Sequence, residues 1–200
     1  MVTKVIFTAI VVGVFIQRLL ELSISKRHVQ SLLSQGGRLH GENYLWLVKV
    51  LQIAWFAAMI AEVWLLQRPF IPVLAAIALF GAVVGQVLRY LSMSALGERW
   101  TLPLITIPGT PIVDFGIYSH LRHPNWLGVI IEIFSVPLIH TAFLTAIFFS
   151  ICNAVIMSVR VQAEEYALSA DNNYASVFAN HPRFIPYMRL IRVRKKEITK

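Results

Sequence analysis

The chain has 200 residues, of which 57% are hydrophobic and only 14% are charged. Its mean hydropathy is +0.67. Because a soluble domain carries about 25% charged residues, and because the apolar residues are spread along the whole chain, this composition excludes a soluble domain with one anchor and indicates an integral membrane protein. The net charge of +8 is concentrated in the last dozen residues. Without a recognition motif it does not indicate a nucleic-acid partner, and a basic tail after membrane helices is typical of contact with anionic membrane lipids.

Five membrane helices are predicted in an all-α fold. A helix that crosses the bilayer core needs roughly 20 apolar residues, and the segments 2–23, 45–66 and 70–94 meet this requirement. The fourth apolar tract, 126–159, is too long to cross once, and Pro137 offers the break because proline interrupts the helical hydrogen bonds. The tract therefore predicts a tight hairpin of two short helices.

Positive charges predict the orientation of these helices. Lysines and arginines gather in the segments 24–44 and 96–125 and in the tail, so the positive-inside rule places the N-terminus outside and the tail in the cytoplasm. We expect one membrane domain, 1–200, with three helices in 1–95, a cytoplasmic loop in 96–125, the hairpin in 126–159 and a cytoplasmic helix or loop segment in 160–200. The 24–44 stretch is predicted to be a connector. The prolines and glycines of the 101–117 segment predict that this segment is an irregular loop.

Two polar stretches flank the predicted hairpin, "YSHLRHPNWLG" (118–128) and "SVRVQAEEYAL" (158–168). Because a hairpin returns to the side it left, Arg160 should arrive near His123. Arg160 and Glu164 are four residues apart and share one helix face. Each also has a purely structural interpretation: a lipid-phosphate contact for Arg122, an interfacial position for His123, an aromatic belt for Trp126, and a weak surface pair for Arg160 and Glu164. The spacing of His120, His123 and His181 matches no common metal site, so we expect no metal.

These stretches resemble the isoprenylcysteine carboxyl methyltransferase family over roughly residues 75–188. The resemblance is carried by "GIYSHLRHPNWLG", "RVQAEEYAL", Tyr174 and the closing "PRFIPY". It implies S-adenosylmethionine as cofactor, with Arg160 facing the substrate and Glu165 or His123 as a candidate general base; Arg160 and Glu165 are the expected catalytic residues. The implied cofactor-binding residues are Thr110, Pro111, Ile112, Val113, Tyr118, His123, Pro124, Asn125, Trp126 and Glu164. The family more often has tyrosine where Trp126 stands, which leaves a hydroxyl contact there in question.

The methyl acceptor is expected to be lipophilic, because the site would open between membrane helices. The stretches "ELSISKRHVQSLLSQGG" and "RWTLPLITIPGTPIV" resemble bacterial family members that methylate hydroxyls of alkylpyrone or alkylresorcinol lipids, and a bacterial inner membrane is the expected location. Other members methylate the carboxylate of a prenylated cysteine. A membrane NADPH-dependent reductase of sterol-like double bonds, and a non-catalytic scaffold or transporter, are the alternative functions.

Polar residues within the predicted spans suggest further pairs. Arg18 and Glu21 are three apart, and Glu132 is placed to meet Arg89. Such charges are costly in a membrane and usually have partners, so they either pair structurally or line the acceptor tunnel. For Glu62 the sequence suggests no partner.

Overall fold

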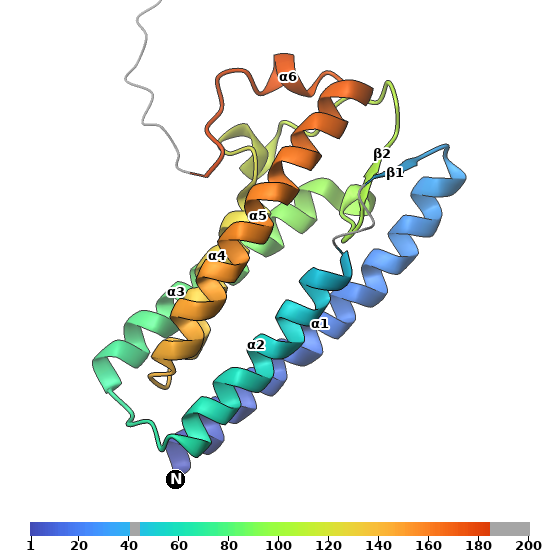
Figure 1. Cartoon of the computed structure of the whole chain (residues 1–200). Coiled ribbons are helices and arrows are strands. Elements are labelled where there is room, and N and C mark those ends of the chain that lie inside the picture. The colour runs from blue at the N-terminus through green and yellow to red at the C-terminus, as the bar shows by residue number, and fades with distance from the viewer. Residues whose placement is uncertain (41–44, 185–200) are drawn as a thin grey trace, which may run out of the picture.

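A computed structural model describes residues 1–40 and 45–184, and helices make up most of it (Figure 1). Two three-residue strands form an antiparallel pair in which Arg38 lies opposite Thr106. The elements in chain order are α1 (Val2–Ser34), β1 (Arg38–His40), α2 (Leu45–Leu65), α3 (Pro72–Leu96), the 3-10 turn η2 (Gly97–Arg99), β2 (Leu104–Thr106), the 3-10 turn η3 (Gly116–Ser119), α4 (Pro124–Leu138), α5 (Phe143–Asp171) and α6 (Tyr174–Val177).

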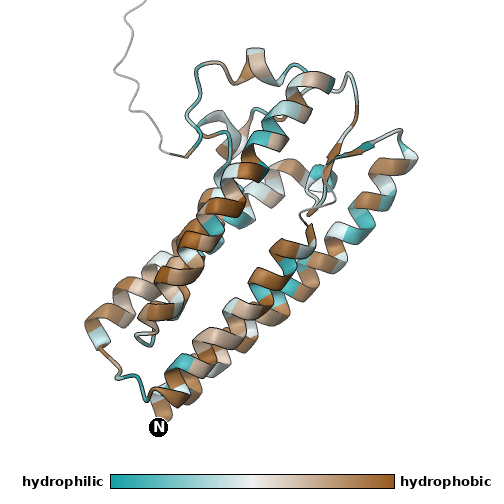
Figure 2. Ribbon diagram, viewed as in Figure 1, coloured by the Kyte–Doolittle hydropathy of each residue, from teal (hydrophilic) through white to brown (hydrophobic). Residues whose placement is uncertain are grey.

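Four of these helices are long and apolar enough to cross a membrane: α1, α2, α3 and α5. Figure 2 shows hydrophobic residues along all four, with more hydrophilic ones at the end of the bundle that carries β1, β2 and α6. The predicted all-α membrane class is therefore confirmed. The predicted count of five spans is not, because α4 has 15 residues and is about 22 Å long, shorter than the bilayer core.

One predicted helix end is wrong. The connector expected from residue 24 is instead the continuation of α1, because residues 24–34 contain no proline or glycine and Ser25 and His28 hydrogen-bond to the backbone of Leu102 and Trp100. The helix ends beside Gly36, whose φ of 86° is left-handed. The predicted tail from residue 160 begins as helix, since α5 continues to Asp171. The basic residues near the C-terminus lie outside the described residues.

The predicted hairpin break is confirmed. Pro137 lies in the last turn of α4, and residues 139–142 turn the chain into α5. The carboxylate of Glu62 on α2 accepts hydrogen bonds from the backbone N–H groups of Leu144 and Thr145, at 3.1 and 2.7 Å, and forms an ion pair with Arg68. Glu62 therefore does have partners: it caps the otherwise unsatisfied start of α5.

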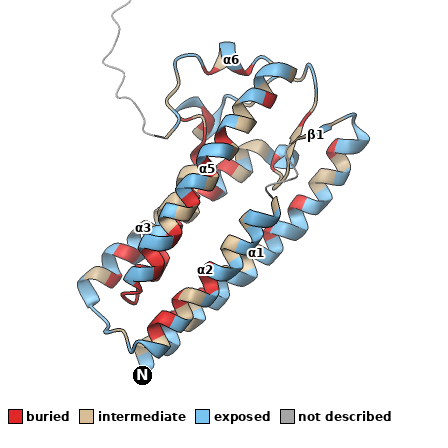
Figure 3. Ribbon diagram, in the orientation of Figure 1, coloured by how far each residue is buried: buried red, intermediate tan, exposed pale blue. Residues whose placement is uncertain are grey.

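The backbones of α3 and α4 approach each other closely. A Cβ atom added at Gly128 would lie 2.7 Å from the carbonyl oxygen of Gly85, and one at Gly85 would lie 2.9 Å from that of Gly128. Small residues permit such contact between membrane helices. Figure 3 shows buried residues on the faces where helices meet and exposed residues on the outer faces, as expected where lipid replaces water.

The first helix reaches α3 and α4 differently, through long polar side chains. Arg18 donates to Glu21 at 2.8 Å and also pairs with Glu132 on α4. Arg89 on α3 pairs with Glu21 and lies 3.7 Å from Glu132. We call these four residues the ion cluster. The two pairs predicted from the sequence, Arg18 with Glu21 and Arg89 with Glu132, are present. Two further pairs join α1 to the other helices, Arg18 to Glu132 on α4 and Glu21 to Arg89 on α3.

Candidate functional site

A cavity of about 370 Å³ lies at the end of the bundle where both polar stretches are found. Its volume falls within the range of small-molecule sites, about 300–1,000 Å³. Parts of α1, α2, α3, α4 and α5 surround it, and the irregular 99–113 segment closes it. Most of the residues implied by the resemblance line this cavity: Thr110, Pro111, Ile112, Val113, Tyr118, His123, Asn125, Trp126, Arg160 and Glu164.

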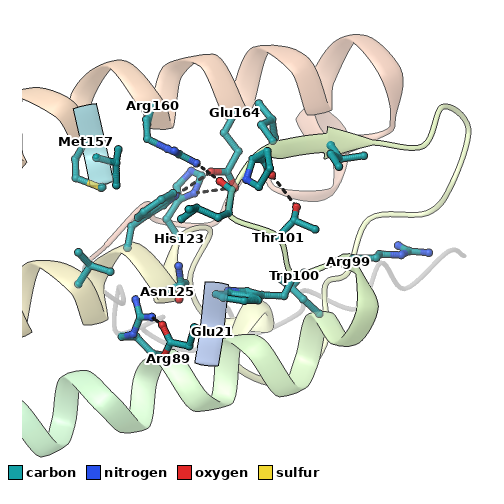
Figure 4. A pocket seen from close by; sticks show the side chains of 18 of the residues that line it. Glu21, Arg89, Arg99, Trp100, Thr101, His123, Asn125, Met157, Arg160 and Glu164 are labelled. Carbon is teal, nitrogen blue, oxygen red and sulfur yellow. Dashed lines mark hydrogen bonds and ion pairs between the residues drawn. The ribbon is translucent and has the colours of Figure 1, made fainter. Parts of the chain in front are cut away.

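Trp126 joins the two polar stretches. The guanidinium of Arg160 lies over its ring, 4.8 Å from the centroid, and its indole N–H donates to Glu164 Oε2 at 2.9 Å. Arg160 also donates through Nη2 to the carbonyl oxygen of Leu102, at 2.8 Å. Figure 4 shows Arg160, Glu164 and His123 together on one side of the pocket. The predicted convergence of Arg160 and His123 is present, and the indole makes the polar contact that was in question at position 126.

His123 precedes the first turn of α4 and is only 2% exposed. Its Nε2 lies 3.1 Å from Glu165 Oε1 and 3.3 Å from the hydroxyl of Tyr174. Its Nδ1 lies 3.8 Å from Glu164 Oε1 and has no hydrogen-bond partner among the described residues. Burial, and then the nearby Glu165 carboxylate, raise the pKa of Tyr174, so the phenol stays protonated. One ring nitrogen of His123 is thus anchored, and the other is left beside Glu164.

Glu165 lies behind His123, and its expected catalytic role stays a prediction. Arg183 donates to both of its oxygens, at 2.9 and 2.6 Å, and these bonds stabilise the carboxylate and make it a poor proton acceptor. It is not among the described residues that line the cavity. Its position behind His123 makes it a residue that orients the imidazole. Successive helix residues point about 100° apart, so Glu164 faces the cavity and Glu165 does not.

Pro124 also lies outside the described lining. It is fully buried at the first position of α4, where its fixed φ favours helix initiation and its missing N–H costs nothing. It supports the wall that Asn125 and Trp126 form, and its expected role as a cofactor contact stays a prediction.

The segment that closes the cavity is tied to the end of α5. The side chain of Asn172 donates to the carbonyl oxygens of Ile107 and Thr110, at 2.9 and 2.7 Å. The N–H of Gly109 donates to the carbonyl oxygen of Asp171, at 3.0 Å. Asn172 was not predicted as a site residue, although an asparagine at a helix end is a usable signal because its amide readily satisfies neighbouring backbone groups.

The tyrosine of the first polar stretch stands behind this segment. Tyr118 packs with Tyr174 and Phe178 in a small apolar cluster at the site end of the bundle. Burial, and then the Glu164 carboxylate, raise the pKa of Tyr118. Its hydroxyl therefore stays protonated in the cavity wall, with Ser92 as a hydrogen-bond partner.

The opposite part of the cavity is formed by apolar residues that were not predicted to belong to the site and by charged residues for which the sequence offered tunnel lining as one alternative. Apolar side chains from α1, α2, α4 and α5 make up most of this part: Phe15, Leu19, Leu22, Ile53, Phe56, Val129, Ile156 and Met157. Three members of the ion cluster, Arg18, Glu21 and Arg89, also line it. The cavity therefore has charged groups beside Trp126 and at the ion cluster, and mostly apolar side chains between membrane helices elsewhere.

Comparisons with known proteins agree with this geometry. Residues 74–170 match the model of the isoprenylcysteine carboxyl methyltransferase (ICMT) family, a range that includes both polar stretches. The chain is 34% identical over 163 residues to the uncharacterized protein YpbQ of Bacillus subtilis (strain 168), covering 81% of this chain and 96% of the relative. It is 28% identical over 153 residues to an uncharacterized protein of Haemophilus influenzae, covering 76% and 88%.

Proposed function

Because the chain belongs to the isoprenylcysteine carboxyl methyltransferase family, whose members are S-adenosylmethionine-dependent membrane methyltransferases, we propose that it transfers a methyl group to an oxygen atom of a lipophilic acceptor. One observation carries this proposal: a single cavity joins a charged wall to an apolar wall between membrane helices. A water-soluble methyl donor and a lipid-dissolved acceptor need such a meeting place.

The charged wall fits the methyl donor. Glu164 presents a carboxylate, and Nδ1 of His123 and Oδ1 of Asn125 are buried without hydrogen-bond partners in the described chain. Such groups suit a ligand that carries a sulfonium, an ammonium and further polar atoms. When bound, S-adenosylmethionine supplies an electrophilic methyl group. We assign its binding to these three residues together with Trp126, Tyr118 and the 110–113 backbone.

Arg160 is the residue we assign to the acceptor. Its Nη2 is held by Leu102, and its remaining N–H groups have no partner within the described residues and lie at the cavity wall. The planar guanidinium can hold an anionic oxygen in line with the methyl group. That oxygen bonds to the methyl carbon as the sulfur–methyl bond breaks, with the electron pair staying on sulfur.

The need for a base depends on the acceptor. A carboxylate or an acidic enol is already ionised near neutral pH and releases no proton. A phenol must lose its proton, and we assign its acceptance to Nδ1 of His123, a cavity-lining residue whose Nδ1 has no hydrogen-bond partner among the described residues. We propose an alkylpyrone- or alkylresorcinol-type lipid as acceptor, with a prenylated cysteine as the alternative substrate. We propose that the site lies at the cytoplasmic face, on the charge distribution alone, and that the membrane is a bacterial inner membrane, on the resemblance to bacterial family members.

The decisive experiment measures methyl transfer by the purified protein from labelled S-adenosylmethionine to a panel of membrane lipids. Arg160→Ala and Glu164→Ala should each abolish transfer while the protein remains folded. Arg27→Ala is the matched control, since this exposed arginine lies at the same end of the bundle outside the described cavity lining. Full activity of both site variants would refute the assignment. Tight binding of NADPH without binding of S-adenosylmethionine would favour the reductase instead.

A further inference from the structure

The ion cluster borders the cavity on the side away from Glu164. Arg18, Glu21 and Arg89 all contribute to its lining, and Glu132 lies directly behind them. The cluster is buried, with Arg89 6% and Glu132 1% exposed. Burying four charges costs free energy even when they are paired, so a role beyond joining the helices has to be considered.

Within the described residues the terminal nitrogens of the cluster are mostly paired, whereas Arg18 Nε, Arg89 Nε and Glu132 Oε1 are buried without a hydrogen-bond partner. Both terminal nitrogens of Arg18 donate to carboxylates, Nη1 to Glu21 and Nη2 to Glu132. Arg89 donates to Glu21 through Nη2, and its Nε is sealed from solvent near Glu132. Its remaining terminal nitrogen, Nη1, makes no hydrogen bond within the described residues and is not among the fully buried atoms. Because Arg89 lines the cavity, this N–H group is available to a molecule inside it.

Figure 4 shows Arg89 and Glu21 on the wall below Asn125, across the pocket from Arg160. Arg160 near the proposed methyl donor and Arg89 on the opposite wall both line the cavity, as do the polar side chains of Lys49, Gln52 and Asn153. Most of the other lining side chains from α1, α2 and α5 are apolar. This arrangement suits a lipid headgroup with two oxygen atoms on different sides.

The charge of the cluster limits which oxygen Arg89 can bind. Two arginines face two glutamates, so the cluster is neutral, and a second full anion beside it would lack a counter-charge in a medium of low polarity. A carbonyl, hydroxyl or ether oxygen accepts a guanidinium N–H without that cost. The free donor of Arg89 therefore selects an uncharged oxygen.

We propose that Arg89 is an acceptor-binding residue that holds a second, uncharged oxygen of the lipid headgroup while Arg160 holds the oxygen to be methylated. This inference rests on the proposed function, since it assigns the acceptor of the same cavity. It makes the acceptor class narrower: long-chain lipids whose headgroup carries two oxygen substituents, in preference to those with one.

The test compares binding of two lipids with the same alkyl chain, an alkylresorcinol and an alkylphenol, to the full-length protein in detergent. The wild type should bind the alkylresorcinol about tenfold more tightly, the effect of one hydrogen bond to a charged group. Arg89→Lys keeps the charge that Glu21 and Glu132 need but lacks the free Nη1, and it should bind both lipids equally. The double variant Glu21→Leu with Arg89→Leu removes a whole ion pair, which proteins tolerate, and should lose the preference as well.

Gln86→Leu is the matched control. Gln86 and Gln17 exchange two amide hydrogen bonds, at 2.8 and 2.9 Å, between α3 and α1, but neither is among the described lining residues. This variant should keep the tenfold preference. The inference is overturned if the wild type shows no preference or binds neither lipid, if both Arg89 variants keep the preference, or if Gln86→Leu loses it.

A separate titration with S-adenosylmethionine distinguishes the two proposals. If the wild type binds S-adenosylmethionine but shows no preference between the lipids, only the role of Arg89 fails. If it shows the preference but never binds the methyl donor, Arg89 stands as a lipid-binding residue and the methyltransferase proposal fails.

Discussion

The contact between α3 and α4 and the approach of α1 to the same two helices are built in opposite ways. In the first, glycines bring two backbones together, and a single added carbon would meet a carbonyl oxygen. In the second, arginine, glutamate and glutamine side chains bridge the space between helices, and the cavity opens beside them. The comparison shows how one bundle can hold its chemical groups rigidly and still leave room for a ligand.

The largest expected effect comes from breaking the close contact. Gly128→Leu would force its side chain against the Gly85 carbonyl oxygen and Arg89. Overpacking costs about 1–3 kcal/mol where neighbours can adjust, and more is expected here because backbone cannot move aside. Little folded protein should be recovered after detergent extraction. Gly13→Leu, where nothing lies within 4 Å, should be recovered normally, and equal recovery of the two would contradict this account.

The next effect concerns Glu62, which joins α2 to the start of α5. Glu62→Leu leaves Arg68 and the N–H groups of Leu144 and Thr145 without their acceptor. Removing one partner of a buried pair costs about 3–5 kcal/mol, so the unfolding temperature in detergent should fall sharply. The exposed Glu98 provides the control, and Glu98→Leu should leave the unfolding temperature nearly unchanged.

A smaller and more local effect is expected at Asn172. Replacement by alanine removes the two hydrogen bonds that hold the segment closing the cavity. We expect S-adenosylmethionine to bind about tenfold more weakly, because ordering that segment then costs roughly 1–2 kcal/mol more. Titration with the methyl donor measures the change. The control variant Gln162→Ala changes an exposed amide on α5 and should bind S-adenosylmethionine normally. A similar loss of affinity in this variant would show that Asn172 has no specific role in binding.

The smallest expected effect concerns the hydrogen-bonded pair Gln17 and Gln86 between α1 and α3. Gln17→Leu or Gln86→Leu alone breaks both hydrogen bonds between these half-buried amides and should cost about 1 kcal/mol of unfolding free energy. The double variant should cost less than the sum of the two single losses, because the bonds between the two amides are lost only once, although the bond from Gln17 to Glu21 is lost as well. Unfolding of the four proteins gives the coupling energy directly. Additive losses would show that the two amides do not act as a pair.

The sequence predicted the meeting of Arg160 and His123 because it depends on one local event, the chain reversal that Pro137 signals. The position of Glu165 was not predictable in the same way, since its partner Arg183 comes from the segment beyond α6. The start of α5 shows the same limit. Nothing near Glu62 in the chain reveals that it caps a helix some eighty residues later.

The apolar wall of the cavity could not be predicted from the sequence for another reason. In a water-soluble helix the hydrophobic side identifies the buried face, but lipid-facing and ligand-facing residues of a membrane helix are equally apolar. Phe56 and Leu19 therefore carry no signal of their place in the site. Arg18, Glu21 and Arg89 were recognisable because charge is rare inside a span.

The ion cluster also bears on how the chain enters the bilayer during synthesis. Arg18 and Glu21 share one helix and already form a pair there, whereas Arg89 and Glu132 are carried by α3 and α4. A lone charge at the middle of an inserting helix costs about 2.5–3.5 kcal/mol. We therefore expect α3 and α4 to leave the insertion machinery together, with arginine and glutamate already neutralising each other, and to meet α1 afterwards.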